Sequence, residues 1–240
     1  MLLKTRGIVL RTLKYSETSI IAEIYTEAKG LRKYIISGVR TAKPKFSASL
    51  LQLMSLVDIV AYERDNRELQ RIKELKAAVV YSQLPFDVRR SAVGLFLIEI
   101  AQKTLKEASE NAILFYFLLH TFIYLDRTPH PIANIPLHFL LHLSVYLGFA
   151  PNGISSEDTP YFNLREGTFL EFELLKYDLS EVQSKAVSQL LDLSIENCHQ
   201  CSMTRKARWD LLEQLILYYQ LHLENFGGAQ AHTILKEVLG

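Results

Sequence analysis

The chain has 240 residues, of which 49% are hydrophobic and 22% charged, and its formal net charge at pH 7 is only +1. This composition excludes an intrinsically disordered chain and indicates one large or two small folded domains. The longest nearly apolar run, residues 112–125, is too short to cross a bilayer, and the N-terminus lacks the pattern of a signal peptide. Two cysteines cannot build a disulfide scaffold, so we expect a cytoplasmic protein that does not enter the membrane.

The near-neutral total conceals a strongly basic N-terminal segment. Residues 1–45 contain ten Lys or Arg against three Glu, a net charge of +7, and residues 46–240 therefore sum to −6. A basic surface attracts a phosphate backbone because each cation that meets a phosphate releases condensed counterions. The segment is a candidate for nucleic-acid binding, although a solubilising face on a small β domain would carry the same charge.

Residues 1–76 have the pattern of a small β-barrel. Five short runs are rich in β-branched and aromatic residues and are separated by polar or glycine-containing turns. Five strands in this length suit an OB-fold, the closed barrel that commonly binds nucleic acids, and an SH3-like barrel would give much the same pattern. The expected strands are Ile8–Tyr15, Ser19–Thr26, Leu31–Ser37, Ser55–Tyr62 and Leu69–Leu75.

The first strand, the third strand and the loop that follows the third carry the cations that we expect to contact DNA. Alternation along the third strand places Arg32 on one face with Tyr34, and Lys33 on the other. The loop Gly38–Ser49 carries three cations and no acid, as a loop that follows a phosphate backbone would. The predicted DNA-binding residues are Arg11, Lys14, Arg32, Lys33, Arg40, Lys43, Lys45 and Phe46.

Four aromatic residues lie among these cations, namely Tyr15, Tyr25, Tyr34 and Phe46. Stacking of a base on such a ring contributes about 1–3 kcal/mol and tolerates any base sequence. The alternative is that the rings fill the barrel, which we favour for Tyr25. Phe46 follows a basic stretch in a loop and is the better candidate for stacking on a base.

From Pro85 onward, apolar residues recur at the three- and four-residue spacing of amphipathic helices. Pro85 fits a first helical position, Asn134 can cap the third helix, and Ser180 with Gln183 makes a capping box. The second helix is apolar all round, which predicts the central helix of a bundle. The expected helices are Phe86–Lys106, Asn111–Asp126, Ile135–Leu147, Glu181–Ile195, Thr204–Asn225 and Gln230–Leu239.

These patterns predict an α+β protein with two domains. Residues 1–78 are expected to form a five-stranded OB-fold β-barrel that binds nucleic acid. Residues 79–240 are expected to form an α-helical domain with an irregular insert at about 149–178, where prolines and glycines break the helical pattern.

No pattern of catalytic residues is found. His138 and His142 have the spacing of two zinc ligands on a helix, but the residues between them lack the glutamate of a metalloprotease helix. We interpret both as histidines satisfied near a core. The chain has no GxSxG elbow, no phosphate-binding GxxxxGK[ST] and no GxGxxG, so we predict that it is not an enzyme.

Three stretches, in this order, resemble the RecO family of bacterial recombination mediators. They are GIVLRTLKYSET near the start, SGVRTAKPKFSASL in the basic loop, and YYQLHLENFGGAQAHTIL after a helix that begins at Arg205. The resemblance implies a nucleoid-associated protein that binds single- and double-stranded DNA and anneals complementary strands. It also implies help in loading the recombinase RecA onto strands coated by single-stranded DNA-binding protein, with RecR and the C-terminal tail of that coating protein as partners.

The residues alone leave a second hypothesis open, a protein–protein adaptor whose basic barrel contacts an acidic protein partner. The chain also departs from the RecO pattern in the segment 150–180, where many relatives carry four zinc-binding cysteines and this chain has none. Cys198 and Cys201 form a lone CxxC pair, and a structural zinc site needs about four ligands. We therefore predict no metal and no cofactor.

Overall fold

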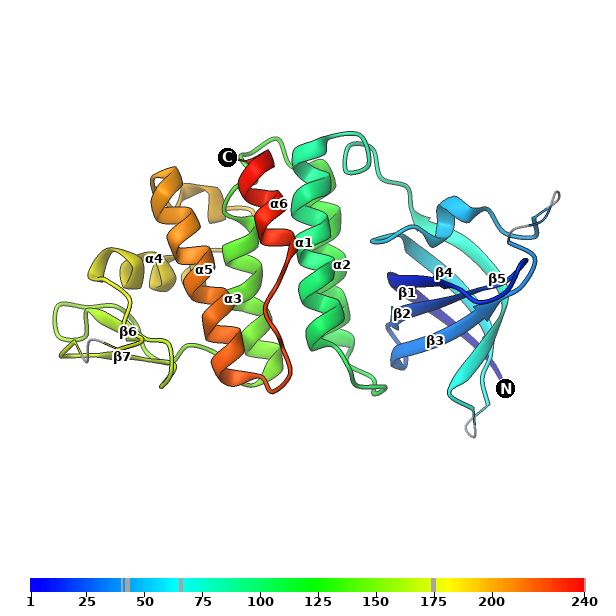
Figure 1. Cartoon of the computed structure of the whole chain (residues 1–240), viewed down its shortest axis with the longest axis horizontal. Coiled ribbons are helices and arrows are strands. Elements are labelled where there is room, and N and C mark those ends of the chain that lie inside the picture. The colour runs from blue at the N-terminus through cyan, green and yellow to red at the C-terminus, as the bar shows by residue number, and fades with distance from the viewer. Residues whose placement is uncertain (40, 42–43, 65–66, 174–175, 240) are drawn as a thin grey trace. The chain divides into compact units, whose positions relative to one another are not determined.

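The computed structural model describes residues 1–39, 41, 44–64, 67–173 and 176–239. The chain forms two compact units, one made of residues 1–82 and 98–123 and the other of residues 83–97 and 124–240. Helices α1 (Val88–Thr104) and α2 (Ala112–Arg127) each contribute residues to both units (Figure 1). The predicted domain boundary after residue 78 stays a proposal.

The first unit contains a closed five-stranded barrel with the strand order β1-β2-β3-β5-β4 (Figure 1). Neighbouring strands are antiparallel except β3 and β5, whose short parallel pairing closes the barrel. This arrangement confirms the predicted OB-fold barrel. The strands are β1 (Leu2–Lys14), β2 (Ile20–Thr26), β3 (Gly30–Ile36), β4 (Leu56–Tyr62) and β5 (Leu69–Val79), with a 3₁₀ helix η1 (Ala48–Leu51) between β3 and β4.

Two of these strands are longer than predicted. β1 begins at Leu2 instead of Ile8, because the residues from Leu2 to Ile8 pair with the whole of β4. β5 continues past Leu75 to Val79, where it pairs with the start of β4. Both extensions depend on pairing with a strand far away in the sequence, which local residue patterns do not show.

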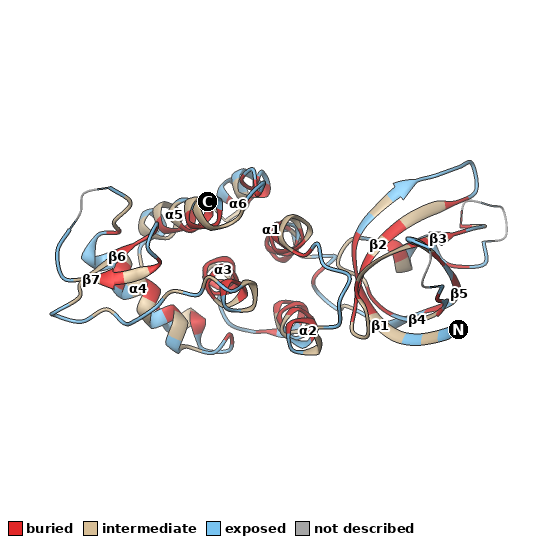
Figure 2. Ribbon diagram, turned by 90° about the horizontal axis from the view of Figure 1, so that it is seen from below, coloured by how far each residue is buried: buried red, intermediate tan, exposed pale blue. Residues whose placement is uncertain are grey.

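The barrel core confirms the alternation predicted for β3. Tyr34 and Ile36 are fully buried among the residues of the core cluster, whereas Lys33 and Ile35 alternate with them on the outer face. Directly paired residues on neighbouring strands share a face, so the same alternation continues across the sheet. Figure 2 colours the buried and exposed positions along the strands.

The second unit is mainly helical. Its elements after α2 are α3 (Ile135–Leu147), β6 (Tyr161–Asn163), β7 (Thr168–Leu170), α4 (Glu181–Asp192), a 3₁₀ helix η2 (Cys198–Gln200), α5 (Arg205–His222) and α6 (Ala231–Val238). The capping box of Ser180 and Gln183 is present at the start of α4. The segment predicted to be irregular contains the β6–β7 hairpin, which is too short to give a clear alternating pattern.

One predicted helix start is wrong, and one predicted cap makes no capping hydrogen bond. α1 begins at Val88 and not at Pro85, because the Asp87 carboxylate accepts hydrogen bonds from the backbone N–H groups of Arg89 (2.8 Å) and Arg90 (3.3 Å) and so serves as the cap. Asn134 precedes α3, but its side chain makes no capping hydrogen bond. It instead donates to two backbone carbonyl groups, those of Cys198 and Cys201, each at 2.9 Å.

The apolar sequence of α2 predicted a helix buried on all sides, but part of its surface is exposed. Ile113 is 72% exposed and Tyr116 46% exposed. The Tyr116 hydroxyl accepts a hydrogen bond from the Arg6 guanidinium (2.6 Å) and donates one to Glu27 (2.8 Å), and Arg6 and Glu27 also form an ion pair at 3.0 Å. No helix in the described part of the chain is long and apolar enough to span a membrane.

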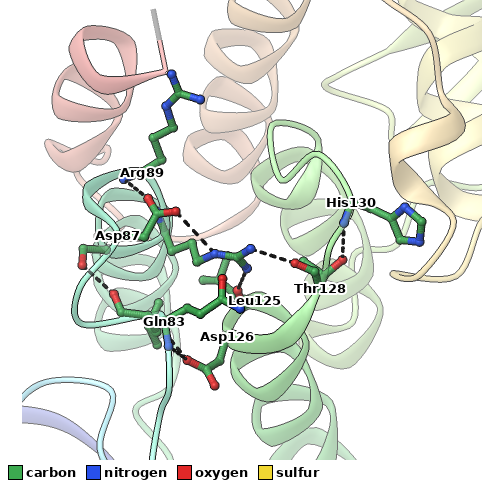
Figure 3. Close-up of polar contacts among 10 residues, drawn as sticks. Gln83, Asp87, Arg89, Leu125, Asp126, Thr128 and His130 are labelled. Carbon is green, nitrogen blue, oxygen red and sulfur yellow. Dashed lines mark hydrogen bonds and ion pairs between the residues drawn. The ribbon is translucent and has the colours of Figure 1, made fainter.

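Within the second unit, the start of α1 and the end of α2 satisfy each other's unpaired backbone groups (Figure 3). The buried Asp126 carboxylate accepts hydrogen bonds from the backbone N–H groups of Gln83 and Leu84, both at 2.8 Å. In the other direction, the buried Arg90 guanidinium donates to the carbonyl groups of Leu125 and Thr128. Helix ends leave such groups without partners inside the helix, so this exchange fixes the relative position of the two ends.

His138 and His142 lie near the core, as predicted, although the buried Nδ1 of His138 has no hydrogen-bond partner among the described residues. Their rings stack at 3.9 Å, and their Nε2 atoms lie 3.0 and 3.2 Å from the carbonyl oxygens of Leu193 and Leu190 at the end of α4. Burial, together with the neighbouring His142, lowers the pKa of His138 to about 4.

We predict that acid weakens the fold through His138. Its pKa is near 6.5 in the unfolded chain and lower in the folded one, so its contribution is complete above about pH 6.5 and is lost as the pH falls toward 4. The free energy of unfolding should fall between about pH 7 and pH 4.5 in both wild type and His138→Asn. The fall should be about 2 kcal/mol smaller in His138→Asn than in wild type. Denaturant titrations at the two pH values measure this difference. The control His120→Asn, at an exposed position, should keep the wild-type difference; an unchanged difference in His138→Asn would refute the prediction.

Candidate DNA-binding surface

A bulge in β1 turns Arg11 toward solvent. Val9 pairs with Ile24, and both lie in the barrel core, so simple alternation would also point Arg11 inward. The register shifts between Val9 and Arg11, and Arg11 pairs directly with Glu23. Because the extra residue at the bulge reverses the alternation, Arg11 lies exposed on the outer face.

The outward residues of four neighbouring strands form one continuous surface, which we call the outer face. Arg11, Glu23 and Lys33 are paired in one row across β1, β2 and β3. The next row runs through Leu13, Ile21, Ile35 and Arg71 of β1, β2, β3 and β5. The outer face is defined by Arg11, Leu13, Ile21, Glu23, Lys33, Ile35 and Arg71.

The predicted cations do not all lie on this face. Lys33 does, but its ammonium group is bonded to Glu68, and this hydrogen bond raises the pKa of Lys33. Arg32 pairs with Ile24 of the core and therefore lies on the inward side of β3, where its buried Nε has no hydrogen-bond partner among the described residues. Arg6 was not predicted, and its charge is already paired with Glu27.

The loops at one end of the barrel bring two further predicted cations together. Lys14 is exposed at the end of β1, and the backbone N–H of Val39 donates to the Thr18 carbonyl (3.1 Å), which joins the two loops that follow β1 and β3. Lys45 is exposed in the second of these loops. The predicted residues Arg40 and Lys43 lie outside the described residues.

Phe46 is buried in the barrel core, with only 8% of its surface exposed. The Lys45 ammonium lies 5.1 Å from the centre of its ring. A ring that fills the core cannot offer a face to a base, so we leave Phe46 out of the proposed surface. Of the other three rings, Tyr25 and Tyr34 are also buried, whereas Tyr15 is 59% exposed beside Lys14.

Sequence reasoning missed a basic groove beside the turn that joins β4 and β5. Three arginines and a tyrosine line it, and its volume is about 890 Å³. The signal in the sequence is three arginines within eight residues next to an aromatic strand end, but a polar stretch between two strands is equally typical of a turn. The lining residues are Ile35, Tyr62, Arg64, Arg67, Glu68, Leu69, Gln70 and Arg71.

The two cysteines of the CxxC pair, Cys198 and Cys201, are buried free thiols. Burial raises the pKa of Cys198 to about 12. A thiol reacts and binds metals as the thiolate, so this environment keeps Cys198 inert. Within the part of the chain that the structure describes, no three His, Cys, Asp or Glu side chains are grouped to hold a metal ion.

The fold and this surface together define an OB-fold protein that carries a basic outer face and a helical C-terminal part. Residues 1–81 match the family model described as Recombination protein O N terminal, and residues 85–228 match Recombination protein O C terminal. The chain therefore belongs to the RecO family, and its role lies in DNA repair and recombination.

Full-length relatives agree with this assignment. The DNA repair protein RecO of Christiangramia forsetii is 34% identical over 241 residues, with 100% of each chain covered. Those of Bacteroides fragilis and Flavobacterium johnsoniae are 35% and 33% identical, with 99% of each chain covered.

We predict that the purified protein holds much less than one zinc ion per chain and that a chelator leaves its melting temperature unchanged. The reason is the absence of cysteines between residues 150 and 180, together with the protonated state of the Cys198 thiol. Elemental analysis and thermal melts with and without EDTA measure both quantities. One tightly bound zinc per chain, with a melting temperature that falls on chelation, would show that Cys198, His199 and Cys201 bind metal with a fourth ligand.

Proposed function

We propose that the barrel binds single- and double-stranded DNA through the outer face and the basic loops at its ends, and that it anneals complementary strands. The observation that carries this proposal is the presence of two outward arginines, Arg11 and Arg71, together with the exposed Lys14 and Lys45. Among the described residues, none of Arg11, Lys14, Lys45 and Arg71 has an ion-pair partner.

The proposed mechanism is electrostatic. Cations that neutralise two phosphate backbones together lower the repulsion between complementary strands. Contacts to phosphates position a strand without reading its bases, so annealing of any sequence is expected. The reaction makes and breaks base pairs only, and we assign no catalytic residue.

The chain beyond residue 76 is net negative, and several cations of the second unit already have polar partners. Lys206 is paired with Asp210 at 2.6 Å and Lys236 with Glu213 at 3.5 Å. The Arg208 Nε donates to the Asn134 side chain at 2.7 Å. We therefore propose that this unit provides stability and partner surfaces.

Its partners, by the family resemblance, are RecR and the C-terminal tail of single-stranded DNA-binding protein. The proposed biological role is to help load the recombinase onto strands coated by that protein. An acidic tail with an apolar end requires an apolar pocket with a basic rim, and we assign no residues to it.

We predict that changing Arg40, Lys43 and Lys45 together to Ala weakens DNA binding equally for all sequences. Each lost phosphate contact removes about 0.7–0.9 from the slope of log affinity against log salt, so the slope should fall by about 2–3. Fluorescence anisotropy with labelled single-stranded and duplex DNA, over a series of salt concentrations, measures the slope.

The matched control changes three exposed helix cations, Arg127 of α2, Lys185 of α4 and Arg205 of α5, to Ala. It should keep both affinity and slope. If the control loses affinity and the loop variant does not, DNA lies on the second unit. If wild type binds an acidic polypeptide but neither form of DNA, the adaptor hypothesis is correct instead.

A further inference from the structure

The groove at the turn between β4 and β5 combines an exposed aromatic ring with three arginines that form no ion pair among the described residues. Tyr62 is 44% exposed at the end of β4. Arg71 is paired directly with Tyr62 on one side and with Ile35 on the other, so all three side chains share the outer face of the barrel. Directly opposed residues of this kind have Cβ atoms about 5 Å apart, so Arg71 and Tyr62 are neighbours on this face.

A buried side chain is hydrogen-bonded to the backbone of the other two arginines. Gln70 is only 4% exposed, and its amide oxygen accepts a hydrogen bond from the backbone N–H of Arg64 (3.0 Å). Its amide nitrogen donates to the carbonyl groups of Arg64 (2.9 Å) and Arg67 (2.5 Å). Both arginines are therefore held on a braced backbone, which lowers the entropy lost when they bind a ligand.

The charges of the groove suit an anion. The side chains of Arg64, Arg67 and Arg71 form no ion pair with any residue that the structure describes. Among the described residues that line the groove, the one acidic side chain, Glu68, is bonded to Lys33. Arginine forks bind phosphate oxygens in a two-point geometry, so three arginines without a described ion-pair partner favour a ligand with phosphates.

We propose that this groove is a stacking subsite for one unpaired base of single-stranded DNA, with the base on the Tyr62 ring and its flanking phosphates on Arg64, Arg67 and Arg71. The inference rests on the proposed function and adds to it a discrimination between forms of DNA. A base in a duplex has both faces covered by its neighbours, so only a single strand gains the stacking energy. The volume of about 890 Å³ lies within the size range of small-ligand sites.

The test compares Tyr62→Leu with Tyr62→Phe in the full-length protein. The probes are a fluorescein-labelled oligothymidylate and a labelled duplex of the same length, followed by anisotropy. Leucine removes the aromatic face, so the affinity for oligothymidylate should fall about 5- to 100-fold while the affinity for the duplex changes by less than about twofold. Phenylalanine keeps the ring and should keep both affinities. Equal loss of both DNA forms in Tyr62→Leu, or no loss of either, would overturn the proposal.

A second measurement needs no variant and covers the case in which Tyr62→Leu fails to fold. Wild-type protein is irradiated with an oligonucleotide that carries 5-iododeoxyuridine, and the crosslinked peptide is sequenced. The expected crosslink is at Tyr62; crosslinks confined to other residues would overturn the subsite while leaving the proposed function intact. If wild type bound neither DNA, the proposed function itself would fail. The remaining outcome is that an acidic peptide displaces oligothymidylate from wild type and binds equally well to Tyr62→Leu. That result would assign the groove to a protein partner and overturn the proposal.

Discussion

Closure of the barrel by the short parallel pairing of β3 and β5 is the constraint on which the rest of this surface depends. It joins three residue pairs, Lys33 with Leu69, Tyr34 with Gln70 and Ile35 with Arg71. The middle pair points inward, where Gln70 braces the β4–β5 turn and Tyr34 is fully buried in the core. The two flanking pairs point outward, so the same closure places Arg71 of β5 beside β3 on the outer face.

Charge is distributed between the two units in a way that separates their tasks. The barrel segment, residues 1–76, holds fifteen Lys or Arg against eight Asp or Glu, and the rest of the chain is net negative. Some cations of the second unit are used within it, as Arg90 shows by satisfying the carbonyl groups at the end of α2. Buried or paired cations leave little charge for a phosphate backbone, whereas Arg11, Lys14, Lys45 and Arg71 of the barrel are exposed and have no ion-pair partner among the described residues.

Local patterns predicted the strands, most helices and the capping box, because each depends on residues close in the sequence. They failed where a distant partner decides. Contacts with other elements determine three such features. They are the bulge that turns Arg11 outward, the core position of Phe46 and the hydrogen bonds that Asn134 donates to a distant backbone segment. The groove around Tyr62 was missed for the same reason, since β3 and β5 meet only in the closed barrel. Composition could show that the barrel is basic, but not which cations stay unpaired.

The most direct test of this account is hydrogen–deuterium exchange of the full-length protein with and without single-stranded DNA. Exchange reports the backbone amides that become protected in the complex, without altering any residue. The account predicts slower exchange in β1, β3 and β5 and in the loops at the barrel ends, with residues 124–239 unchanged. Slower exchange confined to residues 124–239 would contradict it and place the DNA on the second unit.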